Sequence, residues 1–177
     1  MQALRVAPKI HYFDTFKEFN EEFKLGKNDL LVTNEFIYEP YVKPLGIETN
    51  VIFQEKFGQG EPSDEMIDNM KKEMDKFSFD RIVAFGGGTI VDICKILALD
   101  VPPQSYKLFT GEVPPKKIKK LVVIPTTCGT GSEVTPFAVI TDEVTGNKYP
   151  LADYALLPNM AIIDADMMMN APKGLTS

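Results

Sequence analysis

A strand, a glycine turn and a helix follow one another near the middle of this sequence, and that succession constrains the fold most. The apolar run Arg81–Phe85 is typical of a buried strand. Gly86-Gly87-Gly88 comes next, and the run Ile90–Leu99 has the pattern of a helix. Such a turn brings backbone N–H groups and the positive end of a helix to one place, which suits a phosphate. The sequence therefore predicts a phosphate-binding turn.

A second stretch repeats this design further along the chain. The apolar run Leu121–Ile124 is followed by segment 125–133, which is rich in glycine and small hydrogen-bonding side chains. Those side chains are Thr126, Thr127, Thr130 and Ser132. Either loop alone is compatible with an ordinary turn. Together they favour a cofactor with two phosphates, or one that lies across both loops.

The rest of the chain alternates strands with helices, which predicts an α/β fold: a mostly parallel sheet with helices on both faces, in a Rossmann-like nucleotide-binding domain. Helices are expected after an Asp14 cap, over 34–45, after Ser63 and over 89–99, whereas 102–115 has no periodicity. The remaining strands are expected at Lys9–Phe13, Asp29–Thr33, Asn50–Phe53, Phe137–Thr141, Lys148–Pro150 and Ala161–Asp164. Ligands bind at the carboxyl ends of such strands, where both loops fall.

Composition excludes several classes of protein. A net charge of −6 argues against a nucleic-acid partner, and no apolar run is long enough to cross a membrane. The only cysteines, Cys94 and Cys128, suit a reducing cytoplasm and are expected to be unpaired packing residues. The only histidine is His11, so this chain alone cannot build a histidine-rich metal site.

Three features keep two interpretations each. In the run Thr89-x-x-Asp92, Asp92 either completes a helix capping box or faces a ribose or a substrate at the mouth of the loop. Lys95 is either a surface charge or a phosphate partner. The basic run 116–120 is either a solvated loop or a source of mild attraction for an anionic ligand. The glycine turn itself is not the Rossmann fingerprint, because Val91 replaces the third glycine and Tyr106 stands where the ribose acid is expected.

Taken together, three motifs resemble the iron-containing (group III) alcohol dehydrogenases. They are the run 86–95, with its three glycines, Thr89, Asp92 and Lys95, the run 125–133, and the run 157–164, which ends in Ala-Ile-Ile-Asp. The resemblance extends from about Asp29 to the end of the chain. Within the family, the chain looks most like the bacterial 4-hydroxybutyrate dehydrogenases.

The resemblance implies a nucleotide-binding domain over residues 1–177, with NAD or NADP held in a cleft between it and a helical domain. Gly87, Gly88 and Thr89 would hold the pyrophosphate, and Thr126, Thr127, Thr130 and Ser132 would line the phosphate and nicotinamide side. Asp92 and Lys148 would lie near the nicotinamide ribose. Asn34 matches the position where the family often has an aspartate for the adenosine ribose. Its neutral side chain leaves NAD or NADP open, and Glu35 is a candidate to restore discrimination.

The family's metal ligands, an aspartate and three histidines, belong to the helical domain. The resemblance therefore implies that this chain is the cofactor half of the enzyme, truncated before that domain, with no catalytic or metal-binding residue of its own. The complete enzyme would use Fe²⁺ or another divalent metal to interconvert a primary alcohol and its aldehyde, with 4-hydroxybutyrate and succinate semialdehyde as a candidate pair.

The alternatives are a non-catalytic nucleotide-binding module, and a fold-mate such as a glycerol dehydrogenase or a dehydroquinate-synthase-like lyase. Without the helical domain, apolar residues over 163–169 are expected to be exposed and to favour association, including a homo-oligomer.

Overall fold

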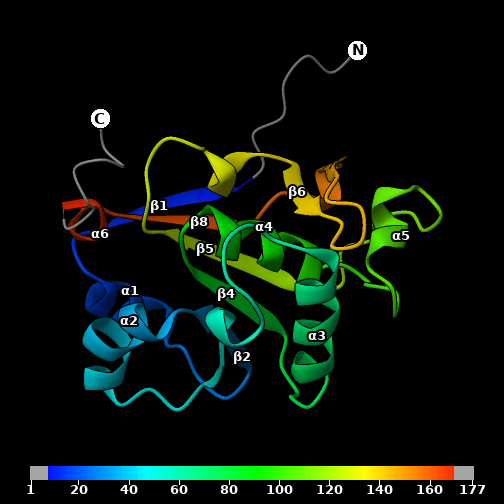
Figure 1. Cartoon of the computed structure of the whole chain (residues 1–177). Coiled ribbons are helices and arrows are strands. Elements are labelled where there is room, and N and C mark those ends of the chain that lie inside the picture. The colour runs from blue at the N-terminus through cyan, green and yellow to red at the C-terminus, as the bar shows by residue number, and fades with distance from the viewer. Residues whose placement is uncertain (1–7, 170–177) are drawn as a thin grey trace.

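The computed structural model of the chain describes residues 8–169, in which six parallel strands form the central sheet (Figure 1). Their order across the sheet is β1-β8-β5-β4-β2-β3, and every neighbouring pair is parallel. The strands are β1 (Lys9–Phe13), β2 (Asp29–Thr33), β3 (Asn50–Phe53), β4 (Arg81–Gly86), β5 (Lys120–Pro125) and β8 (Met160–Asp164). The predicted parallel sheet is confirmed.

A separate two-stranded sheet packs against the helix that follows β4. It consists of β6 (Phe137–Thr141) and β7 (Lys148–Ala152), which pair antiparallel. The Asp142 carboxylate holds the turn between them, because it accepts hydrogen bonds from the Val144 N–H and the Thr145 hydroxyl, both at 2.8 Å. This hairpin carries the chain from the second predicted phosphate loop back toward β8.

The helical segments connect these strands. They are α1 (Phe16–Phe23), α2 (Glu35–Ile37), the π-helix η1 (Tyr38–Val42), the 3₁₀ helices η2 (Lys43–Leu45), η3 (Gln54–Lys56), η4 (Ser132–Val134) and η5 (Tyr154–Leu156), and the α-helices α3 (Asp64–Met74), α4 (Gly88–Leu97), α5 (Tyr106–Phe109) and α6 (Ala165–Met169). In Figure 1, α1 and α2 lie together on one side of the molecule and α3 lies apart from them.

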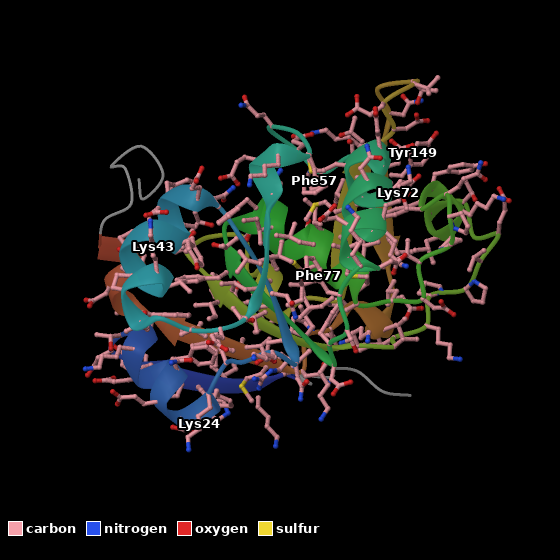
Figure 2. The ribbon with its side chains drawn as sticks, turned by 90° about the horizontal axis from the view of Figure 1, so that it is seen from below. Lys24, Lys43, Phe57, Lys72, Phe77 and Tyr149 are labelled. Atoms are coloured by element: carbon pink, nitrogen blue, oxygen red, sulfur yellow. The ribbon has the colours of Figure 1, made fainter. Side chains whose placement is uncertain are left out.

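Alternate residues of the sheet face two different hydrophobic cores, because successive side chains of a strand point to opposite faces. In β4, Ile82 and Ala84 pack in the core that contains α3 and α4, whereas Val83 and Phe85 pack in the core that contains α1. Phe57, Phe77 and Tyr149 pack at the border of the first core and are labelled in Figure 2. Helices therefore cover both faces, as the sequence predicts.

Several local predictions are wrong in detail. Thr15, not Asp14, caps α1: its hydroxyl accepts from the Glu18 N–H at 3.2 Å. The segment 34–45 is three short helices of different type rather than one, because Pro40 and Pro44 have no N–H to continue an α-helix. The region 102–115, expected as a loop, contains α5.

The end of α1 lies before Gly26 and Asn28, two residues that commonly follow a helix. Lys24 ends the helix in a left-handed conformation, with φ of 48°. Its N–H donates to the Asn20 carbonyl at 2.8 Å, and Figure 2 labels its side chain. The chain thus turns before it reaches the glycine, and among the described residues Lys24 is the only non-glycine with a positive φ.

The basic run and one cysteine also depart from the simplest expectation. Lys117 donates to the Leu157 carbonyl and Lys119 to the Phe79 carbonyl, so the run is not simply solvated. Burial lowers the pKa of Lys117 to about 8. Cys94 is fully buried as expected, but Cys128 is exposed and is not a packing residue.

Candidate nucleotide-binding site

A cavity of about 650 Å³ opens at the carboxyl ends of β2, β3, β4 and β5. Eight of its lining residues are polar or glycine: Asn34, Gln54, Gly60, Gly87, Gly88, Thr89, Thr126 and Thr127. The other six are apolar or aromatic: Phe36, Ile37, Pro40, Tyr41, Ile90 and Met167. None of the described residues that line the cavity carries a charged side chain, so a charged ligand would be held by N–H and hydroxyl donors.

The first loop presents the beginning of α4 to this cavity. Gly87 precedes the helix, and the first helical bond runs from the Val91 N–H to the Gly87 carbonyl at 3.1 Å. The N–H groups of Gly88, Thr89 and Ile90 therefore have no acceptor within the helix. Three free donors at the positive end of a ten-residue helix suit an anion.

The three glycines of this loop have different structural roles. A Cβ at Gly86 would lie 2.5 Å from Ile90 Cδ1, so this glycine lets α4 pack tightly on β4. A Cβ at Gly87 would meet only Thr127, at 3.7 Å, and one at Gly88 only Thr130, at 4.0 Å. A Cβ at either position would fit in ordinary contact with the second loop, but it would occupy part of the cavity in which a phosphate can approach the backbone.

The second loop is fixed to α4 by a buried lysine. Lys95 has no exposed surface, and its Nζ donates to Ser132 Oγ at 2.7 Å and to the Phe137 carbonyl at 2.6 Å. Longer contacts reach Thr135 Oγ1 at 3.3 Å and Asp92 Oδ1 at 3.5 Å. Burial lowers the pKa of Lys95, and the Asp92 carboxylate opposes that shift. Lys95 is therefore neither a surface charge nor exposed to a phosphate, and both interpretations from the sequence are wrong.

Asp92 takes part in the same network. Its Oδ1 accepts from the Ser132 hydroxyl at 2.6 Å, and its Oδ2 accepts from the Val139 N–H at 3.4 Å. The predicted capping box does not form, because Thr89 lies inside the helix and its hydroxyl donates to the Gly60 carbonyl at 3.2 Å. Thr89 thereby ties the loop before α3 to the rim of the cavity.

The cavity brings together six of the ten predicted site residues, and the others lie apart from its lining. The six are Asn34, Gly87, Gly88, Thr89, Thr126 and Thr127. Asp92 and Ser132 lie in the network around Lys95, and Thr130 accepts from the Ser132 N–H at 3.3 Å. Lys148 is on β7, where its ammonium pairs with Glu61 at 2.8 Å and more than half of its side chain is exposed.

Sequence reasoning missed the other eight lining residues, among them Gln54 and Met167, and it missed Glu55, which is not in the lining but is hydrogen-bonded to Asn34. Gln54 and Glu55 follow β3 directly, so their place at a carboxyl end was available as a signal. Met167 lines the cavity and is 6% exposed, against the expectation of an exposed apolar segment over 163–169. The side chains of Met168 and Met169 lie outside the described ones.

Asp164, the last residue of the third motif, turns the chain into α6. Its Oδ1 accepts from the Asp166 N–H at 3.0 Å, whereas its Oδ2 is buried and meets no donor among residues 8–169. Burial raises the pKa of Asp164, although the Asp166 N–H opposes the shift. This motif residue thus has a structural role at the same edge of the sheet.

Comparison with known proteins decides the family. The model of the iron-containing alcohol dehydrogenases matches residues 8–165. The chain belongs to this family. Its relatives include the 4-hydroxybutyrate dehydrogenase of Clostridium kluyveri, which is 42% identical over 172 residues that cover 97% of this chain and 46% of that protein.

Solved structures agree with the fold of an iron-containing alcohol dehydrogenase. An iron-containing alcohol dehydrogenase from Thermotoga maritima matches with a TM-score of 0.78 at 25% identity, over 99% of this chain and 51% of that one. Sulfoacetaldehyde reductase from Bifidobacterium kashiwanohense, solved in complex with NAD+, matches with a TM-score of 0.83 at 22% identity, over 99% and 49%. The chain thus spans about half the length of these relatives.

The family name implies iron, and the described part of the chain offers no place for it. Residues 8–169 contain no group of three or more histidine, cysteine, aspartate or glutamate side chains that could hold a metal ion. The donors at the cavity are amide N–H groups and threonine hydroxyls, which suit a phosphate rather than a divalent metal. Among the same residues, no helix is long and apolar enough to cross a membrane.

Proposed function

We propose that this chain is the cofactor-binding half of a nicotinamide-dependent alcohol dehydrogenase. The observation that carries the proposal is the meeting of the two loops: a Cβ added at Gly87 would lie 3.7 Å from Thr127 and one at Gly88 would lie 4.0 Å from Thr130, beside free N–H groups of α4. A diphosphate fits this donor set. The shared fold with a structure solved in complex with NAD+ supports a dinucleotide.

Different parts of the cavity lining then receive different parts of the cofactor. The pyrophosphate lies at the beginning of α4, and the adenosine extends toward Asn34 and Phe36, whose ring is 74% exposed and available for stacking. The nicotinamide lies toward the second loop, near the predicted residues Thr130, Ser132, Asp92 and Lys148. Bound nicotinamide supplies hydride transfer, and the residues of this chain hold and orient it.

The activity proposed for the complete enzyme is the interconversion of a primary alcohol and its aldehyde. The similarity to the Clostridium kluyveri enzyme favours 4-hydroxybutyrate and succinate semialdehyde as the substrate pair. We expect a protein that contains both halves to reduce NAD+ faster with 4-hydroxybutyrate than with butanol, as followed by NADH absorbance. Equal rates would contradict the substrate assignment and leave the dinucleotide site unaffected.

A second candidate function is a nucleotide-binding module without catalysis. The absence of a metal-binding group among residues 8–169 favours it for the chain alone. Both candidates require dinucleotide binding, and alcohol turnover by the 177-residue chain would contradict the second. The exposed thiol of Cys128 suits a reducing compartment, so we infer a cytoplasmic location for either one.

Calorimetric titration with NAD+ and with ADP-ribose tests the shared site. We expect both ligands to bind, and Gly88→Ala to weaken binding about tenfold because its methyl group fills the gap beneath the phosphate. Gly26→Ala is the matched control, since that glycine lies outside the cavity and a Cβ there meets nothing within 4 Å. Absence of heat with either ligand at millimolar concentration would overturn the proposed function.

A further inference from the structure

A carboxylate from the neighbouring strand lies directly behind Asn34. Asn34 follows β2 and Glu55 follows β3, and these two strands pair side by side. Asn34 Nδ2 donates to Glu55 Oε2 at 2.8 Å, and the Glu35 N–H donates to Glu55 Oε1 at 2.6 Å. Both oxygens of Glu55 are thus engaged by the residues that begin α2, which fixes a negative charge at this edge of the cavity.

The same contacts determine how the Asn34 amide is oriented. A carboxylate only accepts hydrogen bonds, so the group that faces Glu55 must be the amide nitrogen. The nitrogen also contacts Gln54 Oε1 at 3.4 Å, and Gln54 is itself oriented because its Nε2 donates to the Gly58 carbonyl at 2.9 Å. Both N–H groups of Asn34 are therefore used inside the protein, and its carbonyl oxygen is left for a ligand in the cavity that Asn34 lines.

We propose that Glu55 is the residue that makes this site select a dinucleotide with a free 2′-hydroxyl over one with a 2′-phosphate. The inference rests on the proposed function and names the cofactor as NAD rather than NADP. Asn34 contacts the ribose, and Glu55 acts through Asn34 and through its own charge. Glu55 is thus assigned the discriminating role for which the sequence suggested Glu35. Only the backbone N–H of Glu35 bonds to Glu55, and the Glu35 side chain is exposed.

The physical basis is a difference in hydrogen-bonding capacity and charge. A ribose hydroxyl can donate to Asn34 Oδ1, which Glu55 holds in place. An ionised phosphate is mainly an acceptor, and the Asn34 side chain has no N–H left to offer it. The phosphate also brings about −1.5 to −2 charges toward the Glu55 carboxylate. Burial opposes the ionised form of Glu55, but the hydrogen bonds from the Glu35 N–H and the Asn34 amide help to lower its pKa below the ordinary value. Lys56, the next residue along the chain, places its ammonium over the Phe53 ring at 4.8 Å from the ring centre, and its charge helps to lower the pKa of Glu55.

Calorimetric titration of the 177-residue chain with NAD+ and with NADP+ tests the proposal. We expect wild type to bind NAD+ at least about tenfold more tightly than NADP+. Glu55→Gln keeps a side-chain acceptor but removes the charge, so it should reduce this ratio about tenfold, mainly by improving the affinity for NADP+. The effect should shrink as salt concentration rises, because salt screens the charge of a partly exposed carboxylate.

Two further variants separate Glu55 from charge in general. Glu21→Gln removes the same charge from an exposed position of α1, and we expect the NAD+ to NADP+ ratio to stay within about twofold of wild type. Glu35→Gln tests the rival acid and should behave in the same way. If either variant changes the ratio as much as Glu55→Gln does, the proposal is wrong. If Glu55→Gln does not fold, Asn34→Ala takes its place in the test. We expect Asn34→Ala to weaken the binding of NAD+ about fivefold and to change the binding of NADP+ less.

The outcomes distinguish this inference from the function on which it rests. If wild type binds neither dinucleotide, the proposed function fails and the inference fails with it. If wild type binds both equally well, or if Glu55→Gln leaves the ratio unchanged, the inference alone is overturned and the dinucleotide site stands. A clear preference for NAD+ that is lost in Glu55→Gln alone supports both.

Discussion

The two loops at the mouth of the cavity reach the same place by different means. The first passes from β4 straight into α4, and its shape follows from three consecutive glycines and from tight packing on Ile90. The second, after β5, has only the short helix η4 before β6. It is held by hydrogen bonds from Lys95, a residue on α4 that lies 37 positions earlier than Ser132 in the sequence.

The first loop is therefore held by residues close to it in the sequence, and the second by a residue that is distant in the sequence. The first loop depends on residues within one turn of it, so its stability and its ability to accept a ligand can be changed separately. The second loop depends on a buried charge, whose removal leaves several acceptors without a donor. We therefore expect substitutions that support the second loop to cost more than those in the first.

The largest effect should come from Lys95→Ala. Removing the ammonium leaves Ser132 Oγ, the Phe137 carbonyl and Asp92 without their buried partner, and it opens a cavity. We expect the free energy of unfolding to fall by about 3 kcal/mol in urea denaturation. Lys17→Ala, an exposed position of α1, should change it by less than about 0.5 kcal/mol. A similar small change for Lys95→Ala would show that the second loop needs no buried charge.

Two glycine substitutions should divide the first loop into a packing position and a ligand position. Gly86→Ala places a Cβ 2.5 Å from Ile90 Cδ1, and we expect a loss of about 2 kcal/mol because Ile90 is buried and has little room to move. Gly88→Ala has open space, so its unfolding free energy should stay within about 0.5 kcal/mol of wild type while nucleotide binding weakens. Equal destabilisation by both would contradict this division.

Ser132→Ala should have an intermediate effect on the second loop. It removes one acceptor of Lys95 and the donor to Asp92 but leaves the two charges paired at 3.5 Å. We expect a loss of about 1 kcal/mol in thermal unfolding, smaller than that of Lys95→Ala. Combining the two substitutions should cost less than the sum of the separate losses, because both act on one network.

The smallest effect should be a pH dependence at a lysine that lies outside both loops. Burial lowers the pKa of Lys117 to about 8, whereas the ordinary value is 10.5. Between these values the unfolded chain binds more protons at this residue, so its contribution to unfolding free energy rises as pH increases from about 8 to 10.5. Partial exposure limits the rise to less than about 1 kcal/mol. Lys117→Met should lack this rise in alkaline denaturation, whereas Lys116→Met should retain it.

The sequence by itself determined the sheet, the glycine turn and the family, because those features are local. Alternating apolar residues specify which face of a strand is buried, and consecutive glycines specify where the backbone can bend or approach another group closely. Six of the ten predicted site residues line the cavity for the same reason: they directly follow strands whose carboxyl ends meet at one edge.

Only the tertiary structure decided the roles of Lys95, Asp92 and Glu55. A lysine one turn into a helix looks exposed in sequence, and it is buried here because η4 and β6 pack against this part of α4. Glu55 meets Asn34, 21 positions away, only because β2 and β3 pair in register. Such contacts join residues that are distant in the chain, and neither periodicity nor composition encodes the distance between them.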